Sequence, residues 1–437
     1  MQRSLPFFGD TTSGAVIRPE RLPTNTTTHK HPVHRWFNFI AGFSPEFVSE
    51  VLEEPNADRG DVLLDPFAGC GTAPLVGLKK KLSVVGFEPH PIFYRISRAK
   101  LIPPLGWSHV ERIHNAIRNG LARPCSVAVL APAQAAFLGK LFPHRSLEAL
   151  LGAREYLRVQ DLLKDDLAFL ILSKVVEKSS HSQTDGIYKA PTSRREPMDP
   201  VFACESIIRM IKTDLTTCAD RSPQAKVALH QCSSESMPQV QTGSVSVIIT
   251  SPPYLNNFDY AEMTRMLLYF WDIADSWGAI TDLVRSKLLV NTTTALKGHK
   301  TPKAQETYRS RIPIAICSQL EPLVEMLRQQ RAARAGKKEY DLLVLPYFAQ
   351  MLAVLEECKR VLKPRATIHI MIADAALYGV HIPTPQLLRD MLEQIGFEQA
   401  ECSLVRARGH RWALEKRTGS DTGLGEYCIR ARRGCHT

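Results

Sequence analysis

Asp65-Pro66-Phe67-Ala68-Gly69-Cys70-Gly71-Thr72 decides the fold through the segments on either side of it. It follows the apolar run Val62-Leu63-Leu64, which predicts a short buried strand. Residues 72–81 fit a helix, and the mainly apolar residues 82–87 fit a second strand. A strand, a tight turn, a helix and another strand in this order predict the first unit of a doubly wound α/β fold.

The composition of this turn indicates what it could bind. Gly69 and Gly71 allow the backbone to approach a ligand closely, and the start of the helix offers unpaired N–H groups. Glu88 follows the second strand, where a carboxylate can accept hydrogen bonds from both hydroxyls of a ribose. Pro74 replaces the third glycine of a dinucleotide fingerprint, and the Gly-Lys-Ser/Thr of a phosphate loop is absent. The pattern favours S-adenosylmethionine over NAD or ATP, with Asp65 facing its charged amino acid end; the alternative is a purely structural turn.

A second segment, Ser251-Pro252-Pro253-Tyr254, ends the predicted strand 245–249, because two prolines cannot continue a central strand. Ligands bind at this edge of an open α/β sheet. The amino nitrogen of cytosine or adenine is a poor nucleophile, because its lone pair is delocalised into the ring. The Ser251 hydroxyl and the Pro252 carbonyl could accept hydrogen bonds from it, while the prolines preorganise the segment. Tyr254 could stack on an extruded base. No covalent intermediate is required, and Pro124-Cys125, in a helical region, is a poor candidate for a cysteine nucleophile.

With both segments in view, the sequence resembles the DNA amino-methyltransferases that modify cytosine N4 or adenine N6. Residues 65–72 resemble that family's cofactor motif, and residues 251–254 match its (Ser/Asn/Asp)-Pro-Pro-(Tyr/Phe) catalytic motif. The resemblance covers residues 34–100, 227–272 and 345–430. It implies a Rossmann-like, seven-stranded α/β methyltransferase sheet with helical insertions, which binds S-adenosylmethionine and methylates a base flipped from double-stranded DNA.

The resemblance also implies the roles of individual residues. Ser251, Pro252, Pro253 and Tyr254 are the expected catalytic residues. The expected cofactor-binding residues are Asp65, Pro66, Phe67, Gly69, Gly71, Thr72, Glu88, Phe43, Ser44 and Ser233. The expected substrate-binding residues are Asn257, Asp259 and Tyr260.

Two departures from the family pattern stand out. An Asp usual before the catalytic strand is replaced by Cys232-Ser233-Ser234, so Ser233 is expected to make its contact with the cofactor adenine. The glycine usual after Lys-Pro is Arg365. Ser at the first catalytic position favours cytosine N4, with adenine N6 as the alternative. RNA base methylation also stays open, as does nucleic-acid binding without catalysis.

The organisation predicted for the chain has six parts. They are a loose arm (1–30), the cofactor-binding half of the domain (31–100), a helical insertion with a polar loop (101–226), a catalytic segment (227–274), a basic insertion (275–345) and the rest of the sheet (346–437). The basic insertion is expected to contact DNA; a rival is the loop 177–200 with Arg194 and Arg195. A helix is expected at 346–362, a strand at 367–372 and a closing antiparallel pair within 399–430.

Composition supports this interpretation in a general way. The net charge of +11 suits a polyanionic partner. The ten cysteines form no Cys-x-x-Cys pair and the fourteen histidines show no metal spacing, so no metal site is expected. Single cysteines without a signal peptide, and no apolar run long enough to cross a bilayer, predict a cytoplasmic protein without membrane contact. A restriction endonuclease is a candidate partner.

Overall fold

The computed structural model describes residues 25–37, 42–53, 60–101, 106–184, 189–190, 196–217, 225–334, 338–407 and 424–435. Its centre is a seven-stranded sheet in the order β10-β11-β7-β6-β1-β2-β5. The strands are β1 (Val62–Asp65), β2 (Ser83–Phe87), β5 (Val227–His230), β6 (Val245–Thr250), β7 (Leu362–Ala373), β10 (Phe397–Ala407) and β11 (Gly425–Arg433). β5, β2, β1, β6 and β7 are parallel neighbours, and β11 pairs antiparallel with both β7 and β10. The predicted seven-stranded doubly wound fold is therefore confirmed, including the antiparallel pair at its end.

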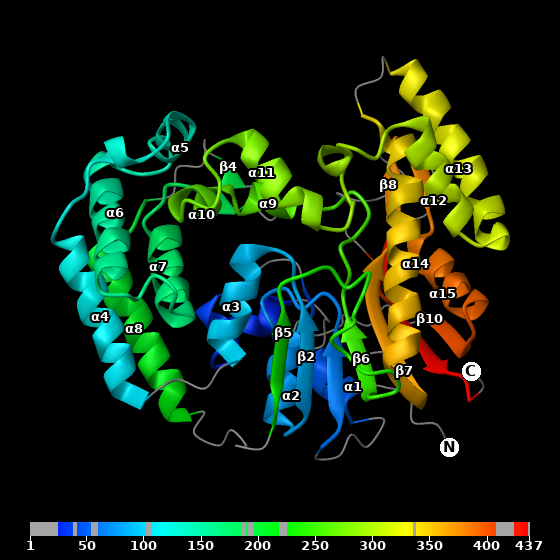
Figure 1. The fold of residues 1–437 in the computed structure, drawn as a ribbon, viewed down its shortest axis with the longest axis horizontal. Coiled ribbons are helices and arrows are strands. Elements are labelled where there is room, and N and C mark those ends of the chain that lie inside the picture. The colour runs from blue at the N-terminus through cyan, green and yellow to red at the C-terminus, as the bar shows by residue number, and fades with distance from the viewer. Residues whose placement is uncertain are drawn as a thin grey trace.

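The sheet is covered on both faces, as parallel strands require. Leu63 and Leu64 illustrate the cause, since successive side chains of a strand point to opposite faces and these two belong to different hydrophobic clusters. Helices α1 (Pro45–Val51), α2 (Thr72–Lys79) and α3 (Pro91–Leu101) contribute to the cluster that contains Leu63. Helices α14 (Val344–Val361) and α15 (Thr384–Gln394) contribute to the one that contains Leu64. In Figure 1 the carboxyl ends of the parallel strands point toward the upper half of the molecule.

The predicted helical insertion forms a separate group of helices beside the sheet, which we call the helical lobe (Figure 1). It contains α4 (Gly106–Leu121), α5 (Pro132–Leu138), α6 (His144–Val159), α7 (Asp166–Lys178) and α8 (Pro200–Thr217). Buried Asp214 of α8 ties the lobe to the N-terminal part of the chain by accepting hydrogen bonds from Val33 N, Trp36 Nε1 and the Arg35 guanidinium. Residues 25–30, predicted within a loose arm, form a 3-10 helix, η3, and Thr27 donates a hydrogen bond to Glu46 of α1.

The basic insertion is mainly helical and follows two short helices, α9 (Tyr260–Met263) and α10 (Arg265–Phe270), of which α10 lies beside the helical lobe and contacts α5 (Figure 1). It contains α11 (Trp277–Leu283), α12 (Pro302–Arg311), α13 (Ile314–Ala333) and the 3-10 turns η6 (Arg285–Lys287), η7 (Thr293–Ala295) and η8 (Tyr340–Leu342). In Figure 1, α11 lies above the strand ends, while α12 and α13 lie beside α14. No helix of the described residues is long and apolar enough to cross a membrane.

The backbone conformation of Arg365 explains why the family usually has a glycine at this position. Its φ is 64°, in the left-handed region where glycine is favoured. Arg365 lies within β7 beside Pro364, where the register between β6 and β7 shifts. The departure from the family pattern therefore places a non-glycine residue in a strained backbone conformation.

Candidate functional site

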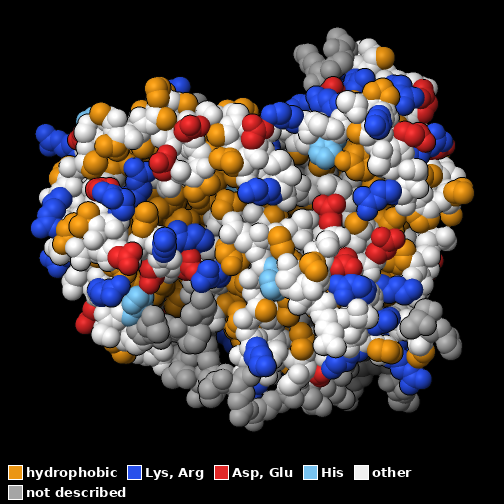
Figure 2. Space-filling view, in the orientation of Figure 1, with side chains coloured by type: hydrophobic (Ala, Val, Ile, Leu, Met, Phe, Trp, Pro, Cys, Tyr) orange, Lys and Arg blue, Asp and Glu red, His pale blue; other side chains and the backbone are white. Residues whose placement is uncertain are grey.

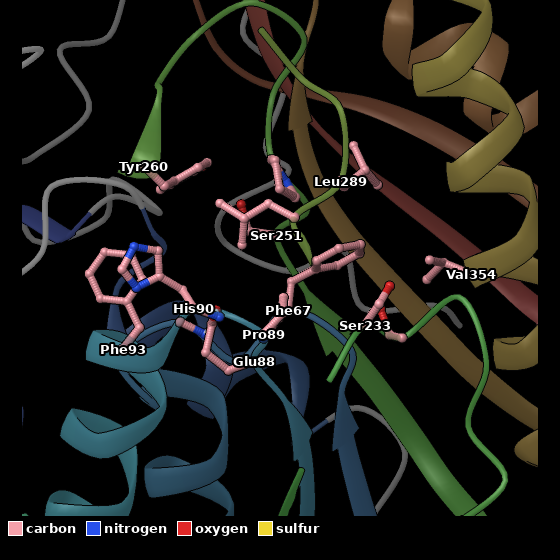
Figure 3. Close-up of a pocket in the computed structure, with 14 residues that line it drawn as sticks. Phe67, Glu88, Pro89, His90, Phe93, Ser233, Ser251, Tyr260, Leu289 and Val354 are labelled. Atoms are coloured by element: carbon pink, nitrogen blue, oxygen red, sulfur yellow. Dashed lines mark hydrogen bonds between the residues drawn. The ribbon is translucent and has the colours of Figure 1, made fainter. Parts of the chain in front are cut away.

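A pocket lies at the carboxyl ends of four adjacent parallel strands, β6, β1, β2 and β5. Its empty volume is about 690 Å³, which includes open solvent. The turn after each strand contributes to its wall: Gly69 after β1, Glu88 after β2, Ser233 after β5 and Ser251 after β6. In Figure 3, Ser251 and Tyr260 lie across the pocket from Glu88 and His90. The two sequence motifs, 186 positions apart when counted from Asp65 to Ser251 (251 − 65), therefore meet at one pocket.

The glycine turn, Asp65–Thr72, needs both of its glycines. Gly69 and Gly71 have φ values of 51° and 83°, and Gly71 is the N-cap of α2. A Cβ atom on Gly71 would lie 3.2 Å from Ser97 Oγ, and that hydroxyl donates a hydrogen bond to the Gly69 carbonyl. The turn is thus packed closely against α3. Phe67 and Gly69 line the pocket, whereas Pro66, Gly71 and Thr72 shape the turn without lining it.

Asp65 lies at the end of β1 and is 2% exposed. Its Oδ1 accepts hydrogen bonds from Thr250 Oγ1 (2.7 Å) and from Phe67 N (3.0 Å), which joins the ends of β1 and β6. Burial raises the pKa of Asp65 to about 7, and these two hydrogen bonds oppose the rise. Oδ2 has no hydrogen bond to another described residue. Asp65 does not line the pocket, but it retains an acceptor for a positively charged group.

Glu88 lines the pocket and is 8% exposed. Its carboxylate accepts hydrogen bonds from Gly69 N (2.9 Å) and His90 N (2.8 Å), so it also braces the glycine turn. Burial raises its pKa to about 7, against these hydrogen bonds. A carboxylate has about four lone-pair directions, and two stay available for ligand hydroxyls.

His90 was not predicted from the sequence. Its Nδ1 accepts a hydrogen bond from Ile92 N, so Nε2 carries the proton and donates to Thr264 Oγ1 at 2.9 Å. Burial lowers the pKa of His90 to about 3, which keeps the ring neutral. His90 packs on Phe93, with ring centroids 4.5 Å apart, and Phe93 contacts Tyr260 edge to face. These rings make an aromatic wall of the pocket and connect the β2 turn to α9.

The turn after β5 lacks the family's Asp but contains an acid nearby. Ser233 Oγ accepts from Glu235 N and donates to Glu235 Oε1, each at 3.2 Å. Gln350 Nε2 also donates to that carboxylate, and burial raises the pKa of Glu235. Ser233 and Ser234 line the pocket. The Ser233 hydroxyl therefore already has an intramolecular partner. Its predicted contact with a cofactor stays a prediction.

The proline segment, Ser251–Tyr254, contains two acceptors that have no hydrogen-bond partner among the described residues. Tyr347 OH donates to the Pro253 carbonyl at 3.0 Å, and Asn291 Nδ2 donates to the Tyr254 carbonyl at 3.3 Å. Neither the Ser251 hydroxyl nor the Pro252 carbonyl is bonded to any residue that the structure describes. Ser251 and Pro253 line the pocket; Pro252 and Tyr254 do not.

The Tyr254 ring is anchored on β11, which lies two strands away from β6 in the sheet. Its hydroxyl donates to Glu426 Oε1 of β11 at 2.7 Å, and Glu426 Oε2 accepts from Arg406 of β10 at 2.6 Å. The antiparallel strands thus fix the direction of the ring. The predicted stacking of this ring on a base stays a prediction, since Tyr254 does not line the pocket.

The three residues predicted to bind substrate differ in their surroundings. Tyr260 lines the pocket, and burial raises its pKa. Asp259 does not line it; its carboxylate caps α9 through Glu262 N and forms an ion pair with Arg285 at 2.9 Å. Asn257 does not line it either, and its backbone N–H donates to Tyr254 O.

Phe43 and Ser44, predicted near the cofactor, are buried outside the pocket lining. Ser44 is the N-cap of α1 and accepts from Phe47 N, and the Phe43 ring lies 5.8 Å from that of Phe47. Both residues help to begin α1. Their predicted contact with a cofactor stays a prediction.

Sequence reasoning missed the pocket residues that come from distant segments. Leu288 and Leu289 of the basic insertion line the pocket, as does Val354 of α14. Tyr347, Gln350 and Val354 follow helical spacing, which places them on one face of α14. That spacing was the available signal, but nothing local showed which face meets the pocket.

Many cations of the basic insertion are already paired within it. Ion pairs join Lys297 to Asp282, Lys300 to Glu339, Arg309 to Glu321, Arg328 to Glu325 and Arg331 to Asp341. Figure 2 shows basic and acidic side chains interspersed over this face of the molecule. The charge of the insertion therefore does not by itself identify a DNA-binding surface. Arg194 and Arg195 of the rival loop lie outside the described residues.

Comparisons with known proteins find relatives over most of the chain. The Type II methyltransferase M.BsoBI of Geobacillus stearothermophilus is 22% identical over 442 residues, which cover 89% of this chain and 83% of its own. M.AvaI of Nostoc sp. is 23% identical over 400 residues (84% and 79%), and M.MvaI of Kocuria varians is 21% identical over 402 residues (85% and 83%). The curated homologues of the chain are thus Type II methyltransferases at low identity. No family model matches.

Among solved structures, the rRNA methyltransferase aviRa from Streptomyces viridochromogenes is 10% identical with a TM-score of 0.32, covering 96% of this chain and 97% of its own. A TM-score of 0.32 is low. The fold assignment therefore rests on the order and direction of the strands.

Proposed function

We propose that this chain is a DNA methyltransferase that modifies the exocyclic amino group of a base, with cytosine N4 as its target. The observation that carries the proposal is the single pocket shared by Phe67 and Gly69 of the glycine turn, Glu88, and Ser251 of the proline segment. The homology of the chain to Type II methyltransferases supports DNA as the substrate. The base must leave the duplex to reach this pocket, because enzymes that act on a base extrude it from the stack.

S-adenosylmethionine is the cofactor, and it supplies an electrophilic methyl group on a sulfonium centre. The residues present suit it: Asp65 Oδ2 is free to accept from its ammonium group, and Glu88 can accept from ribose hydroxyls. The glycine turn lets the backbone approach the ligand. Phe67 and Gly69 line this side of the pocket, and Ser233 with Ser234 lines the end of β5.

The proline segment would prepare the nucleophile. Ser251 Oγ and the Pro252 carbonyl accept hydrogen bonds from the base amino group, which draws its nitrogen toward a tetrahedral shape and makes its lone pair available. The acceptors are fixed before the base arrives, because Tyr347 and Asn291 hold the next two carbonyls. Preorganised acceptors require no rearrangement during the reaction, which is the main source of electrostatic stabilisation in enzymes.

The choice of base rests on Ser251. A hydroxyl at this position is the usual form for cytosine N4, and a carboxylate or carboxamide is usual for adenine N6. The decisive experiment expresses the wild-type chain and a Ser251→Ala variant in a host without other methylation, then maps modified bases in its DNA by single-molecule sequencing. N4-methylcytosine at one sequence motif, lost in Ser251→Ala, is the expected result.

Different results of this experiment would each select a different function. N6-methyladenine at a defined motif would replace the cytosine assignment. Unmodified DNA, together with labelling of RNA in vitro, would make the chain an RNA methyltransferase. Binding of S-adenosylhomocysteine without methyl transfer to either nucleic acid would support a non-catalytic nucleic-acid-binding protein.

Lys287 is the proposed phosphate contact at the pocket. It is exposed, it directly precedes the pocket residues Leu288 and Leu289, and it has no ion pair with another described residue. A Lys287→Ala variant is expected to weaken DNA binding equally for all sequences and to lower the slope of log K against log salt by about one. An unchanged slope would move the DNA path away from η6.

A further inference from the structure

The proline segment and the turn that follows it, residues 255–259, are held by the basic insertion. Asn291, which is 4% exposed, makes three hydrogen bonds to this stretch. Its Nδ2 donates to the carbonyls of Phe258 (2.9 Å) and Tyr254 (3.3 Å), and its main-chain carbonyl accepts from Asn256 N (2.6 Å). One buried residue therefore fixes both ends and the middle of the stretch 254–258.

The stretch has no regular secondary structure to define its shape. Residues 251–259 form neither helix nor strand, and Asn256 has a left-handed φ of 52°. The one internal main-chain bond recorded there runs from Asn257 N to Tyr254 O at 3.3 Å. A buried backbone carbonyl without a partner is costly, so the Phe258 carbonyl depends on Asn291, and the Tyr254 carbonyl shares Asn291 with Asn257 N as its donors. Asn291 thus fixes the main chain of residues 254–258, while Tyr347 holds the Pro253 carbonyl and Glu426 holds the Tyr254 ring.

Asn291 is itself attached to a rigid element. The preceding residue, Val290, donates its N–H to Gln350 Oε1 of α14 at 2.8 Å. Tyr347, one turn earlier on the same helix, donates to the Pro253 carbonyl. On the other side, Arg285 and Thr294 both bond to the Asp259 carboxylate, at 2.9 and 2.8 Å. The insertion and α14 thus enclose the stretch from both sides.

We propose that Asn291 is a positioning residue for methyl transfer: it sets the conformation of residues 254–258 and thereby aims Ser251 Oγ and the Pro252 carbonyl at the base. The proposal rests on the function proposed above. It gives the basic insertion a second role, because a segment expected to contact DNA also builds the active site. Asn291 contacts neither reacting atom, and it acts through the carbonyls that it holds.

The test compares Asn291→Asp and Asn291→Ala with a matched control, Gln305→Ala. Asp keeps the volume of the side chain but cannot donate as a carboxylate, and Ala removes the group without adding charge. Gln305 is the matched control because its Nε2 also bridges two carbonyls of the insertion, His299 O (2.8 Å) and Leu342 O (3.0 Å), and neither belongs to residues 251–259. A general loss of packing in the insertion would affect all three variants.

Three quantities are measured on the full chain: the single-turnover rate of methyl transfer to DNA, the Kd for S-adenosylhomocysteine, and hydrogen–deuterium exchange of residues 251–262. For both Asn291 variants we expect a rate about 100-fold lower, since a displacement of about 1 Å in a catalytic group can cost that factor. We expect an unchanged Kd and faster exchange of residues 254–258. Gln305→Ala should leave rate, Kd and exchange in this stretch near wild type.

The outcomes separate this inference from the proposed function. Wild-type methylation of DNA with an unchanged rate in Asn291→Asp and Asn291→Ala would overturn the positioning role while the function stands. If wild type does not methylate DNA, the proposed function fails, and exchange still decides on Asn291. Unchanged protection of residues 254–258 in Asn291→Ala overturns the inference in either case. An equal slowing by Gln305→Ala would also overturn it, since it would indicate a general structural effect.

Discussion

Replacing Asp65 by asparagine should make the ligand-free protein more stable at alkaline pH and, at the same time, weaken its binding of the cofactor. Asp65 is almost completely buried, and burial raises the pKa of its carboxyl group to about 7. Above that pH the folded protein contains a buried carboxylate whose charge only two hydrogen bonds offset. Asparagine has a similar shape and no charge to desolvate.

The size of the effect follows from the difference in pKa between the folded and unfolded states. The ordinary value is 3.8, so between that pH and 7 the folded state binds the proton and the unfolded state does not. A raised pKa contributes stability that is fully present below the unfolded value and is lost as the pH rises through the folded value. Each pH unit corresponds to about 1.4 kcal/mol, so the total loss is ~4 kcal/mol and the part above about pH 5.5 is ~2 kcal/mol.

Urea denaturation of both proteins at about pH 5.5 and pH 8 measures this difference. The free energy of unfolding of Asp65→Asn relative to wild type should rise by ~2 kcal/mol between the two pH values. Glu88, whose pKa burial also raises to about 7, is present in both proteins, so its contribution largely cancels. Titration calorimetry with S-adenosylhomocysteine at pH 8 should show binding at least about thirtyfold weaker, because a buried charge loses its partner.

Two results would refute this reasoning. An equal difference in unfolding free energy at both pH values would mean that the Asp65 carboxyl group does not titrate near neutrality. An unchanged Kd for S-adenosylhomocysteine would mean that Asp65 serves only to join β1 to β6 through Thr250. The first result would rule out the predicted pH dependence of stability. The second would rule out the contact of Asp65 with the cofactor.

Three further predictions concern backbone conformation and a buried charge. Gly71→Ala should cost about 1–2 kcal/mol of unfolding free energy, because alanine is strained at a φ of 83° and its Cβ would press on Ser97; a melting temperature equal to that of wild type would contradict this. Asp214→Asn should lower the free energy of unfolding, measured by urea denaturation, by about 3 kcal/mol, because Arg35 loses its buried carboxylate partner. A double variant, Arg35→Met with Asp214→Asn, that is no more stable than Asp214→Asn alone would argue against the ion pair as the cause. Arg365→Gly should raise the free energy of unfolding by about 0.5 kcal/mol, since relief of the left-handed strain exceeds the added entropy of the unfolded chain; a destabilised variant would show that the contact of Arg365 with Cys435 matters more.

The predictions of secondary structure succeeded for the central strands of the sheet and missed an edge strand and a helix of the helical lobe. The predicted runs at 62–64, 82–87 and 245–249 correspond to β1, β2 and β6, because buried strands require continuous apolar residues. β5, at the edge of the sheet, was not predicted as a strand: its apolar run Val227-Ala228-Leu229 is short and only half-buried or exposed, and it ends at His230. α4 lies within the predicted helical insertion but was not predicted as a separate helix, although its apolar residues recur at helical spacing and it packs on α6.

By itself the sequence determined the local chemistry of the two motifs. The glycines of the turn, the acid after β2 and the prolines after β6 are constrained by backbone geometry within a few residues, so their type and spacing are informative without a structure. Tertiary structure alone decided which of these groups have partners and which stay free. Asp65 binds Thr250, and the carbonyls of Pro253 and Tyr254 are held by Tyr347 and Asn291, the nearer of which lies 37 positions along the chain from Tyr254. Contacts across such separations depend on the order of the strands, which no local pattern encodes.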